Sequence, residues 1–146
     1  MSGAPSVGYW RLWVGADGVS RQTRCAMTDF TLKSIQPPAD PQWLGEKTSG
    51  AMTMMVTVLP VGWIGDWHPN PKPQWILPLS GVWFVESMDG ARVEMGPGEI
   101  SFGGDQHAAT VDGRRGHRSG TVGEAPAVLM LVQIDDPPAP PPGETG

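Results

Sequence analysis

The segment Gly62-Trp-Ile-Gly-Asp-Trp-His68-Pro-Asn70-Pro-Lys-Pro-Gln74-Trp-Ile-Leu-Pro-Leu-Ser-Gly81 decides how the rest of the chain is interpreted. It contains one of the three histidines, three of the seven tryptophans and four prolines. Histidine is the commonest metal ligand and titrates nearest neutral pH. Prolines fix the backbone around it. The other two histidines, His107 and His117, follow in the next long loop, so the two stretches together are the candidate functional region.

Short strands separated by glycine and proline turns account for most of the chain, which has 20 glycines and 16 prolines without a collagen-like period. No stretch shows helical periodicity over three turns. Residues 127–134 are apolar on both faces, as in a strand that is covered on both sides. One or two strands within 23–35 are expected to turn Phe30 and Leu32 towards a core. The other predicted strands are 9–14, 52–59, 74–79, 82–86, 91–95, 99–102 and 117–122. This pattern predicts an all-β barrel or sandwich.

Length and composition fit a single globular domain of 146 residues. We expect residues 1–134 to form it and the Pro-rich residues 135–146 to be an extended or disordered tail. The net charge of −5 argues against a general nucleic-acid binder. No secretory signal or membrane-spanning stretch is evident, and the single cysteine cannot form an internal disulfide. A cytoplasmic location is therefore expected.

The spacing around His68 carries a family resemblance. Glycine, five residues, His68, one residue, Asn70, three residues, Gln74, six residues and glycine resemble the first cupin motif, in which the positions of Asn70 and Gln74 are histidine and glutamate. All four spacings match. Two of the three usual ligand positions are therefore amides.

A second stretch resembles the other cupin motif. Gly96-Pro97-Gly98-Glu99 is similar to its Gly-Pro-Gly-Asp opening, and Gly113-Arg-Arg-Gly-His117 is similar to its end in small bacterial cupins. The second-motif histidine is His107 or His117, and we favour His117. The resemblance covers roughly residues 8–134. It implies a cupin-type antiparallel β-barrel, a double-stranded β-helix or jelly roll, and dimerisation through an edge strand at 9–14.

If His68, Asn70 and Gln74 continue a strand, all three face the barrel lumen, where small ligands commonly bind. His117 completes the group. Trp67, His107 and Arg118 are further candidates for contacting substrate. The cluster Arg114, Arg115 and Arg118 is either a clamp for an anionic group or a solvated loop.

Two mechanisms remain open at this point. In one, His68, Gln74 and His117 hold a divalent metal (Zn, Fe, Ni or Mn), with Asp66 and Asp105 as candidate carboxylates away from the motif positions. In the other there is no metal, the amides of Asn70 and Gln74 bind a carbonyl or enolate, and a histidine is the general acid or base.

The sequence therefore predicts an enzyme acting on a small organic molecule, most plausibly a lyase, isomerase or cyclase. The alternatives are a non-catalytic small-ligand binder or sensor and, because the carboxylate is missing, less readily a non-heme metal dioxygenase. A barrel whose histidines only satisfy loop carbonyls is the structural alternative. We expect no nucleic-acid or membrane partner, and we expect the protein to form a homodimer.

Overall fold

The computed structural model describes residues 3–135, in which eleven β-strands and their loops are present and no helix occurs. The strands are β1 Val7–Val14, β2 Ser20–Met27, β3 Thr31–Lys33, β4 Gln42–Leu44, β5 Met52–Leu59, β6 Gln74–Ser80, β7 Val82–Ser87, β8 Arg92–Met95, β9 Ile100–Gly104, β10 His117–Val122 and β11 Ala127–Ile134. The predicted all-β class is confirmed. The predicted strand positions agree closely, and the sequence interpretation missed β4 alone.

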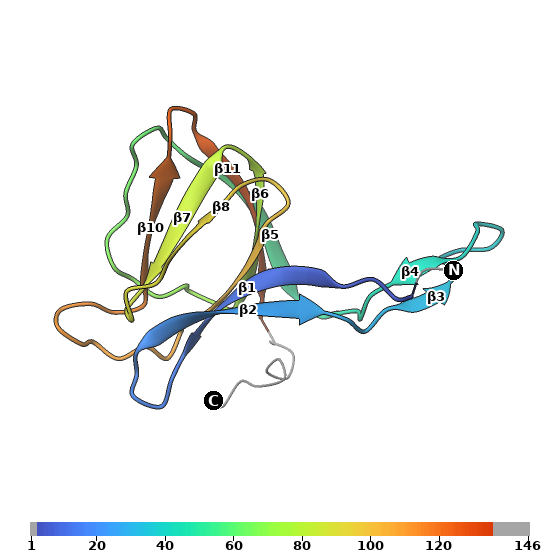
Figure 1. Cartoon of the computed structure of the whole chain (residues 1–146), viewed down its shortest axis with the longest axis horizontal. Helices are drawn as coiled ribbons and strands as arrows, with labels where there is room; N and C mark the ends of the chain where they lie inside the picture. Colours follow the sequence, from blue (N-terminus) through green and yellow to red (C-terminus); the bar gives the residue numbers. More distant parts are fainter. Residues whose placement is uncertain (1–2, 136–146) are drawn as a thin grey trace.

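The strands form two facing sheets and a projecting hairpin (Figure 1). The larger sheet has the order β2-β1-β9-β6-β11-β5, and the smaller has the order β10-β7-β8. Strands β3 and β4 pair only with each other and extend away from the two sheets.

The structure differs from a closed antiparallel barrel in two respects. Neither sheet closes on itself, and the larger one ends at β2 and β5. Strand β1 runs parallel to β9, with Tyr9 opposite Ile100, so the larger sheet is mixed. Because β1 lies between β2 and β9, the expected edge strand at 9–14 has both of its backbone edges paired. The expected route to a dimer through that strand is not open in this arrangement.

The hydrophobic core lies between the two sheets and is built from alternate residues of the facing strands. Its buried members are Leu12, Leu59, Ile76, Trp83, Val85, Met95, Ala127 and Leu129. In β11 the side chains of Ala127 and Leu129 enter this core, and the intervening Val128 points to the opposite face of the sheet. Only one face of β11 is thus packed against the smaller sheet.

The position of the β3–β4 hairpin contradicts the expectation that Phe30 and Leu32 face a core. Leu32 is 42% exposed and Phe30 is half-buried, because the hairpin extends beyond both sheets. The described residues contain no helix that could span a bilayer. The predicted tail 135–146 lies, apart from Asp135, outside the described residues.

Candidate functional site

His68 and His117 lie side by side where the loop before β6 meets the start of β10. The backbone N–H of His68 donates to the carbonyl of His117 at 2.9 Å, and the N–H of His117 donates back at 3.0 Å. The ring centroids are 4.8 Å apart and the ring planes are inclined by 50°. The structure therefore brings together the two histidines that the sequence interpretation favoured.

His68 does not lie in a continuous strand, contrary to the expectation of simple alternation from His68 to Gln74. The pairing with His117 is an isolated bridge, and β6 begins only at Gln74. Pro69, Pro71 and Pro73 lie between the two residues and lack the N–H groups that a continuous ladder requires. The side chains of this segment are consequently placed by specific hydrogen bonds rather than by strand alternation.

The close approach of the two loops depends on Gly116. Its φ is +84°, and a Cβ at this position would lie 2.4 Å from backbone atoms of His68 and Pro69. The buried hydroxyl of Ser20 donates to the Gly116 carbonyl at 2.5 Å. A residue with a side chain would therefore separate His117 from His68.

The buried Asp105 carboxylate fixes the orientation of the His117 ring. Its side chain is completely buried, and its Oδ2 accepts a hydrogen bond of 2.7 Å from Nδ1 of His117. Its Oδ1 accepts from the backbone N–H and from the side-chain Nδ2 of Asn70, both at 2.8 Å. Burial alone would raise the pKa of Asp105, but the hydrogen bond and charge of His117, together with the two donors of Asn70, hold it below its ordinary value. Asp105 is therefore a carboxylate at neutral pH.

Buried amides extend this network across the larger sheet. Nε2 of Gln74 donates to Oδ1 of Asn70 at 2.6 Å, and Nε2 of Gln133 donates to Oε1 of Gln74 at 3.1 Å. The Asn70 side chain lies directly over Gly103, where an added Cβ would approach it to 2.4 Å. Each of these amides makes a hydrogen bond to the next one, so Asn70 and Gln74 are fixed in position.

The hydrogen bonds of the two rings define their tautomers. Nδ1 of His68 lies 2.6 Å from the backbone carbonyl of Asp66, which can only accept, and Nδ1 of His117 faces the Asp105 carboxylate. In the neutral form of either ring, the proton is therefore on Nδ1 and Nε2 is unprotonated. His68 is exposed and His117 is only 5% exposed. The outer ring covers an inner ring that a buried carboxylate orients.

The residues of this site do not fit a three-ligand metal centre as they are arranged. Both ends of the Gln74 amide are engaged by Asn70 and Gln133. Within residues 3–135, no group of three or more His, Cys, Asp or Glu side chains lies close enough together to bind a metal ion. Asp66 is exposed and contributes only its backbone carbonyl. Among the candidate ligands of this site, only the two imidazole Nε2 atoms therefore remain as atoms that could coordinate a metal ion.

The other candidates are Trp67, Arg118 and His107, and they differ in their relation to the two histidines. Trp67 is half-buried, and the guanidinium groups of Arg114 and Arg118 lie 5.4 and 5.8 Å from its ring centroid. Arg118 also donates to Glu86 at 2.8 Å. His107 is exposed, and among the described residues it forms no hydrogen bond or ion pair with either histidine. Trp67 and Arg118 thus border the site, whereas His107 lies outside the network.

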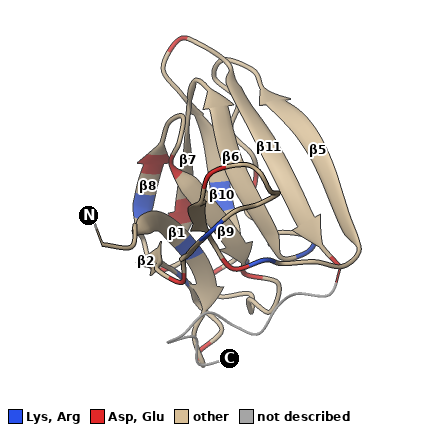
Figure 2. Ribbon diagram, turned by 90° about the vertical axis from the view of Figure 1, so that its right-hand side faces the viewer, with Lys and Arg blue, Asp and Glu red and all other residues tan. Residues whose placement is uncertain are grey.

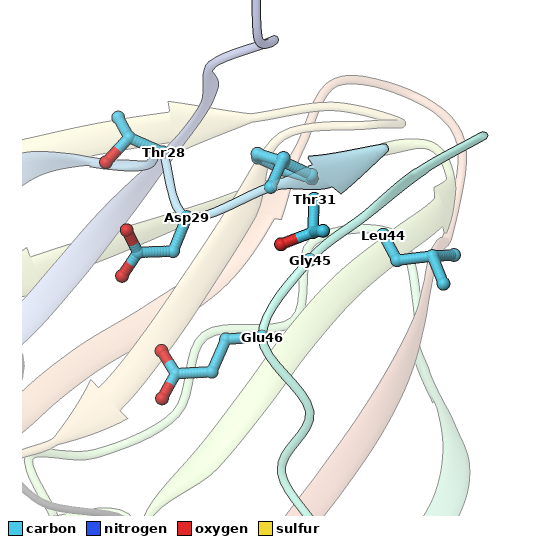
Figure 3. A pocket seen from close by; sticks show the side chains of 7 residues that line it. Thr28, Asp29, Thr31, Leu44, Gly45 and Glu46 are labelled. Atoms are coloured by element: carbon cyan, nitrogen blue, oxygen red, sulfur yellow. The ribbon is translucent and has the colours of Figure 1, made fainter. Parts of the chain in front are cut away.

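The hollows considered among residues 3–135 lie away from the buried network. The larger, of about 410 Å³, lies at the base of the projecting hairpin, and its lining includes Thr31 of β3, Leu44 of β4 and the flanking acidic residues Asp29 and Glu46 (Figure 3). The smaller, of about 110 Å³, is bordered by Val19, Met88 and the loop residues Val111, Asp112 and Arg114. Arg114 connects the smaller hollow to Trp67 and so to the neighbourhood of His68.

No protein-family model and no curated protein sequence matches the chain. Among solved structures, the protein NMB1881 from Neisseria meningitidis is similar, with a TM-score of 0.47 and 16% identity. The alignment covers 61% of this chain and 79% of the other. At this level of similarity the comparison identifies neither a family nor a function.

The sequence interpretation missed two residues of the network and the role of a third. Gln133 and Gln106 were not considered, although Gln133 is the only polar residue of the otherwise apolar β11, which is the signal that could have revealed it. Gln106 donates to the Gly103 carbonyl at 3.0 Å. Asp105 was considered only as a metal ligand, whereas the structure places it behind His117.

Proposed function

We propose that this protein is a cupin-like enzyme that transfers a proton on a small organic molecule, as an isomerase, lyase or cyclase, and that His117 and His68 carry the reaction. The observation that supports the proposal is the buried hydrogen bond of 2.7 Å between Asp105 and His117, whose ring centroid lies 4.8 Å from that of His68. A buried carboxylate that orients a histidine is the arrangement by which enzymes prepare an imidazole for proton transfer.

His117 is the proposed general base. Asp105 fixes the ring and its tautomer through Nδ1, which leaves the Nε2 lone pair to take a proton from the substrate. The carboxylate then stabilises the positive charge that the ring acquires. The amides of Asn70, Gln74 and Gln133 act as positioning residues, because they hold Asp105 in place and are engaged with one another.

His68 is the proposed general acid. Its exposed ring lies against that of His117, and after its Nε2 has taken up a proton from solvent, the resulting imidazolium can give that proton to a second atom of the same substrate. Trp67 and Arg118 border this position and would contact the remainder of the substrate, with Arg118 favouring an anionic group. Two histidines that can each carry a proton could serve a 1,2- or 1,3-proton shift or an elimination, one as the base and the other as the acid.

The resemblance to cupins extends this proposal to the architecture. We propose that the two facing sheets correspond to a cupin-type barrel that is open between β5 and β10. We further propose that the protein works in the cytoplasm without a nucleic-acid or membrane partner. The retained glycine and histidine spacings of residues 62–81 support the assignment. A metal-dependent reaction is less well supported, because Gln74 is already engaged at both ends.

The tautomers can be tested without knowing the substrate. Two-bond ¹H–¹⁵N spectra of the full chain should show Nδ1-protonated neutral rings for His68 and His117, assigned with His68→Gln and His117→Gln variants. In Asp105→Asn, the His117 signals should change and those of His107 should not. An Nε2-protonated His117 in the wild-type protein would contradict the proposed role as a base.

Proton transfer itself can be tested by exchange. The protein, treated with a chelator, is incubated in deuterated water with a panel of small keto acids and hydroxy acids, and loss of C–H signals is followed by NMR. We expect exchange that falls by roughly 100-fold or more in His117→Gln, the usual contribution of a general base. A panel member that binds at His68 without exchanging would indicate a binding protein instead. Exchange that disappears with the chelator and returns with zinc or iron would support the metal mechanism.

A further inference from the structure

The outer face of the larger sheet, formed by the outward side chains of β6, β11 and β5, is apolar and uncharged. The strand register places Trp75, Val132 and Met54 in one row across the three strands. The next row contains Leu77, Met130 and Val56. None of the three strands contains an Asp, Glu, Lys or Arg residue, and in Figure 2 the ribbons of β11 and β5 are tan along their length.

This outer face reaches solvent instead of being packed against another part of the described chain. Met54 is 65% exposed and Val56 is 56% exposed, and Met130 and Val132 of the neighbouring β11 are only half-buried. Single exposed apolar side chains are common on protein surfaces, but contiguous rows of them across three strands mark an interaction surface. The opposite face of the same strands supplies Leu59, Ile76 and Leu129 to the core. These strands are therefore apolar on both faces, although residues 3–135 cover only one.

Among the residues that the structure describes, strand β5 has no partner on its outer side and so adds a free backbone edge to the same surface. It is the last strand of the larger sheet, and its eight residues include no charge, proline or bulge. Edge strands usually carry such features because they prevent association through the open edge. Their absence indicates that the edge of β5 is covered in the working protein.

We propose that the outer face of β6, β11 and β5 is the interface with a second copy of this chain, packed about a two-fold axis. A two-fold axis places the same surface opposite itself. An uncharged apolar face is complementary to its own image, because no charge is brought near a like charge. This interface differs from the one expected at 9–14, where β1 is already paired on both edges.

The dimensions of the outer face agree with a modest dimer. At about 3.4 Å per residue and about 4.8 Å between strands, three strands of this length present roughly 350–400 Å² of projected face per copy. Side-chain relief makes the accessible area larger, and two copies bury it twice. The total approaches the ~1,000–1,200 Å² at which specific interfaces begin. The projecting hairpin, with exposed Leu32 and Ile35, leaves the sheet just before β5 and offers additional area on the same side of the chain.

The residues that follow β11 are a poorer cover for this face. The sequence Asp136-Pro-Pro-Ala-Pro-Pro-Pro-Gly-Glu-Thr-Gly146 contains no Leu, Ile, Val, Met or aromatic residue. It could therefore remove little water from the two apolar rows. A second copy brings an equal number of apolar side chains to the contact.

The test is the mass of the full chain in solution. Sedimentation equilibrium over a concentration series should give twice the chain mass of 15.6 kDa for the wild type. Val56→Lys should weaken the dimer by roughly 100-fold or more, since both copies bring an unpaired charge into an apolar contact. Lysine at this exposed position reaches water in a single copy, so thermal unfolding at low concentration should be unchanged.

A matched control is Val111→Lys, which makes the same change at an exposed valine of the β9–β10 loop and should leave the dimer intact. A wild-type mass of one chain at every concentration would overturn the proposal. So would a dimer that persists unchanged in Val56→Lys and Met54→Lys. Dimerisation that appears only after residues 136–146 are deleted would show that this segment covers the face, and would also overturn it.

Discussion

Replacing Asp105 by asparagine keeps the size of the side chain and removes its charge and one of its two acceptor atoms. The wild-type carboxylate accepts three buried hydrogen bonds, one from His117 and two from Asn70, at 2.7, 2.8 and 2.8 Å. In Asp105→Asn, the remaining oxygen can serve Asn70, and the new NH₂ group then faces the Nδ1–H of His117. His117 must change its tautomer or lose this bond.

The expected cost follows from these contacts. Losing one charge-assisted bond costs about 1.5–3 kcal/mol, and the two bonds to Asn70 become neutral and weaker. Removing one member of a buried ionic pair usually costs about 3–5 kcal/mol, which is an upper limit here because the amide still makes hydrogen bonds. We therefore expect Asp105→Asn to lower the free energy of unfolding by about 2–4 kcal/mol near neutral pH.

The pH dependence of this loss is its most specific feature. The folded-state pKa of Asp105 lies below its ordinary value of 3.8, so the carboxylate stabilises the folded protein above about pH 4. This stabilisation is lost as the pH falls through the folded-state pKa, whereas asparagine does not titrate. The difference between the two proteins should therefore be largest near neutral pH and narrow below about pH 4.

Urea unfolding followed by tryptophan fluorescence at several pH values measures this difference. The control Asp66→Asn removes a carboxylate that is exposed and uses only its backbone to contact His68, so it should change stability by less than about 0.5 kcal/mol. A loss under about 0.5 kcal/mol for Asp105→Asn near neutral pH would refute the reasoning, as would a loss that is equally large at pH 3.

Three other substitutions probe the same network, each by chemical or thermal unfolding. Gly103→Ala should lower the free energy of unfolding by about 1–3 kcal/mol, because its Cβ would displace Asn70. Gly96→Ala should be tolerated, because a Cβ there has only ordinary contacts beyond 3.6 Å. Equal losses of stability in the two variants would contradict this. Gln74→Leu should cost about 1–3 kcal/mol by leaving Gln133 unsatisfied, and Gln74→Leu/Gln133→Leu should recover part of it; an additive loss would argue against the bond. Asn70→Asp should destabilise increasingly as the pH rises, because two buried carboxylates then adjoin; a pH-independent loss would contradict it.

The strand pattern could be predicted from the sequence because it depends on local alternation and on turn residues. Strands β5, β10 and β11 begin and end where the apolar periodicity predicted. The pairing of β1 with β9 could not be predicted in this way, since no local feature distinguishes a parallel from an antiparallel neighbour in a short strand. The same limit applies to closure, which depends on whether β5 and β10 meet across the sheets.

The candidate site was predictable in its outline and not in its chemistry. The spacing around His68 and the resemblance of residues 113–117 to a cupin motif singled out His68 and His117, whose rings lie side by side in the structure. The group that orients His117, however, comes from Asp105 in the loop after β9, and its importance depends on complete burial rather than on any motif. Asn70 and Gln74 were considered as free ligand donors, and only the structure shows that they are bonded to each other.

The apolar character of β5 also bears on how the chain is synthesised. Its sequence, Met-Thr-Met-Met-Val-Thr-Val-Leu, has the uncharged, proline-free composition of segments that pair indiscriminately when unprotected. Its partner in the sheet is β11, which is translated after β6, β7, β8, β9 and β10. Throughout translation of the intervening residues β5 therefore has no native strand to pair with. High yields should depend on slow synthesis or chaperone capacity more than on the thermodynamic stability of the finished fold.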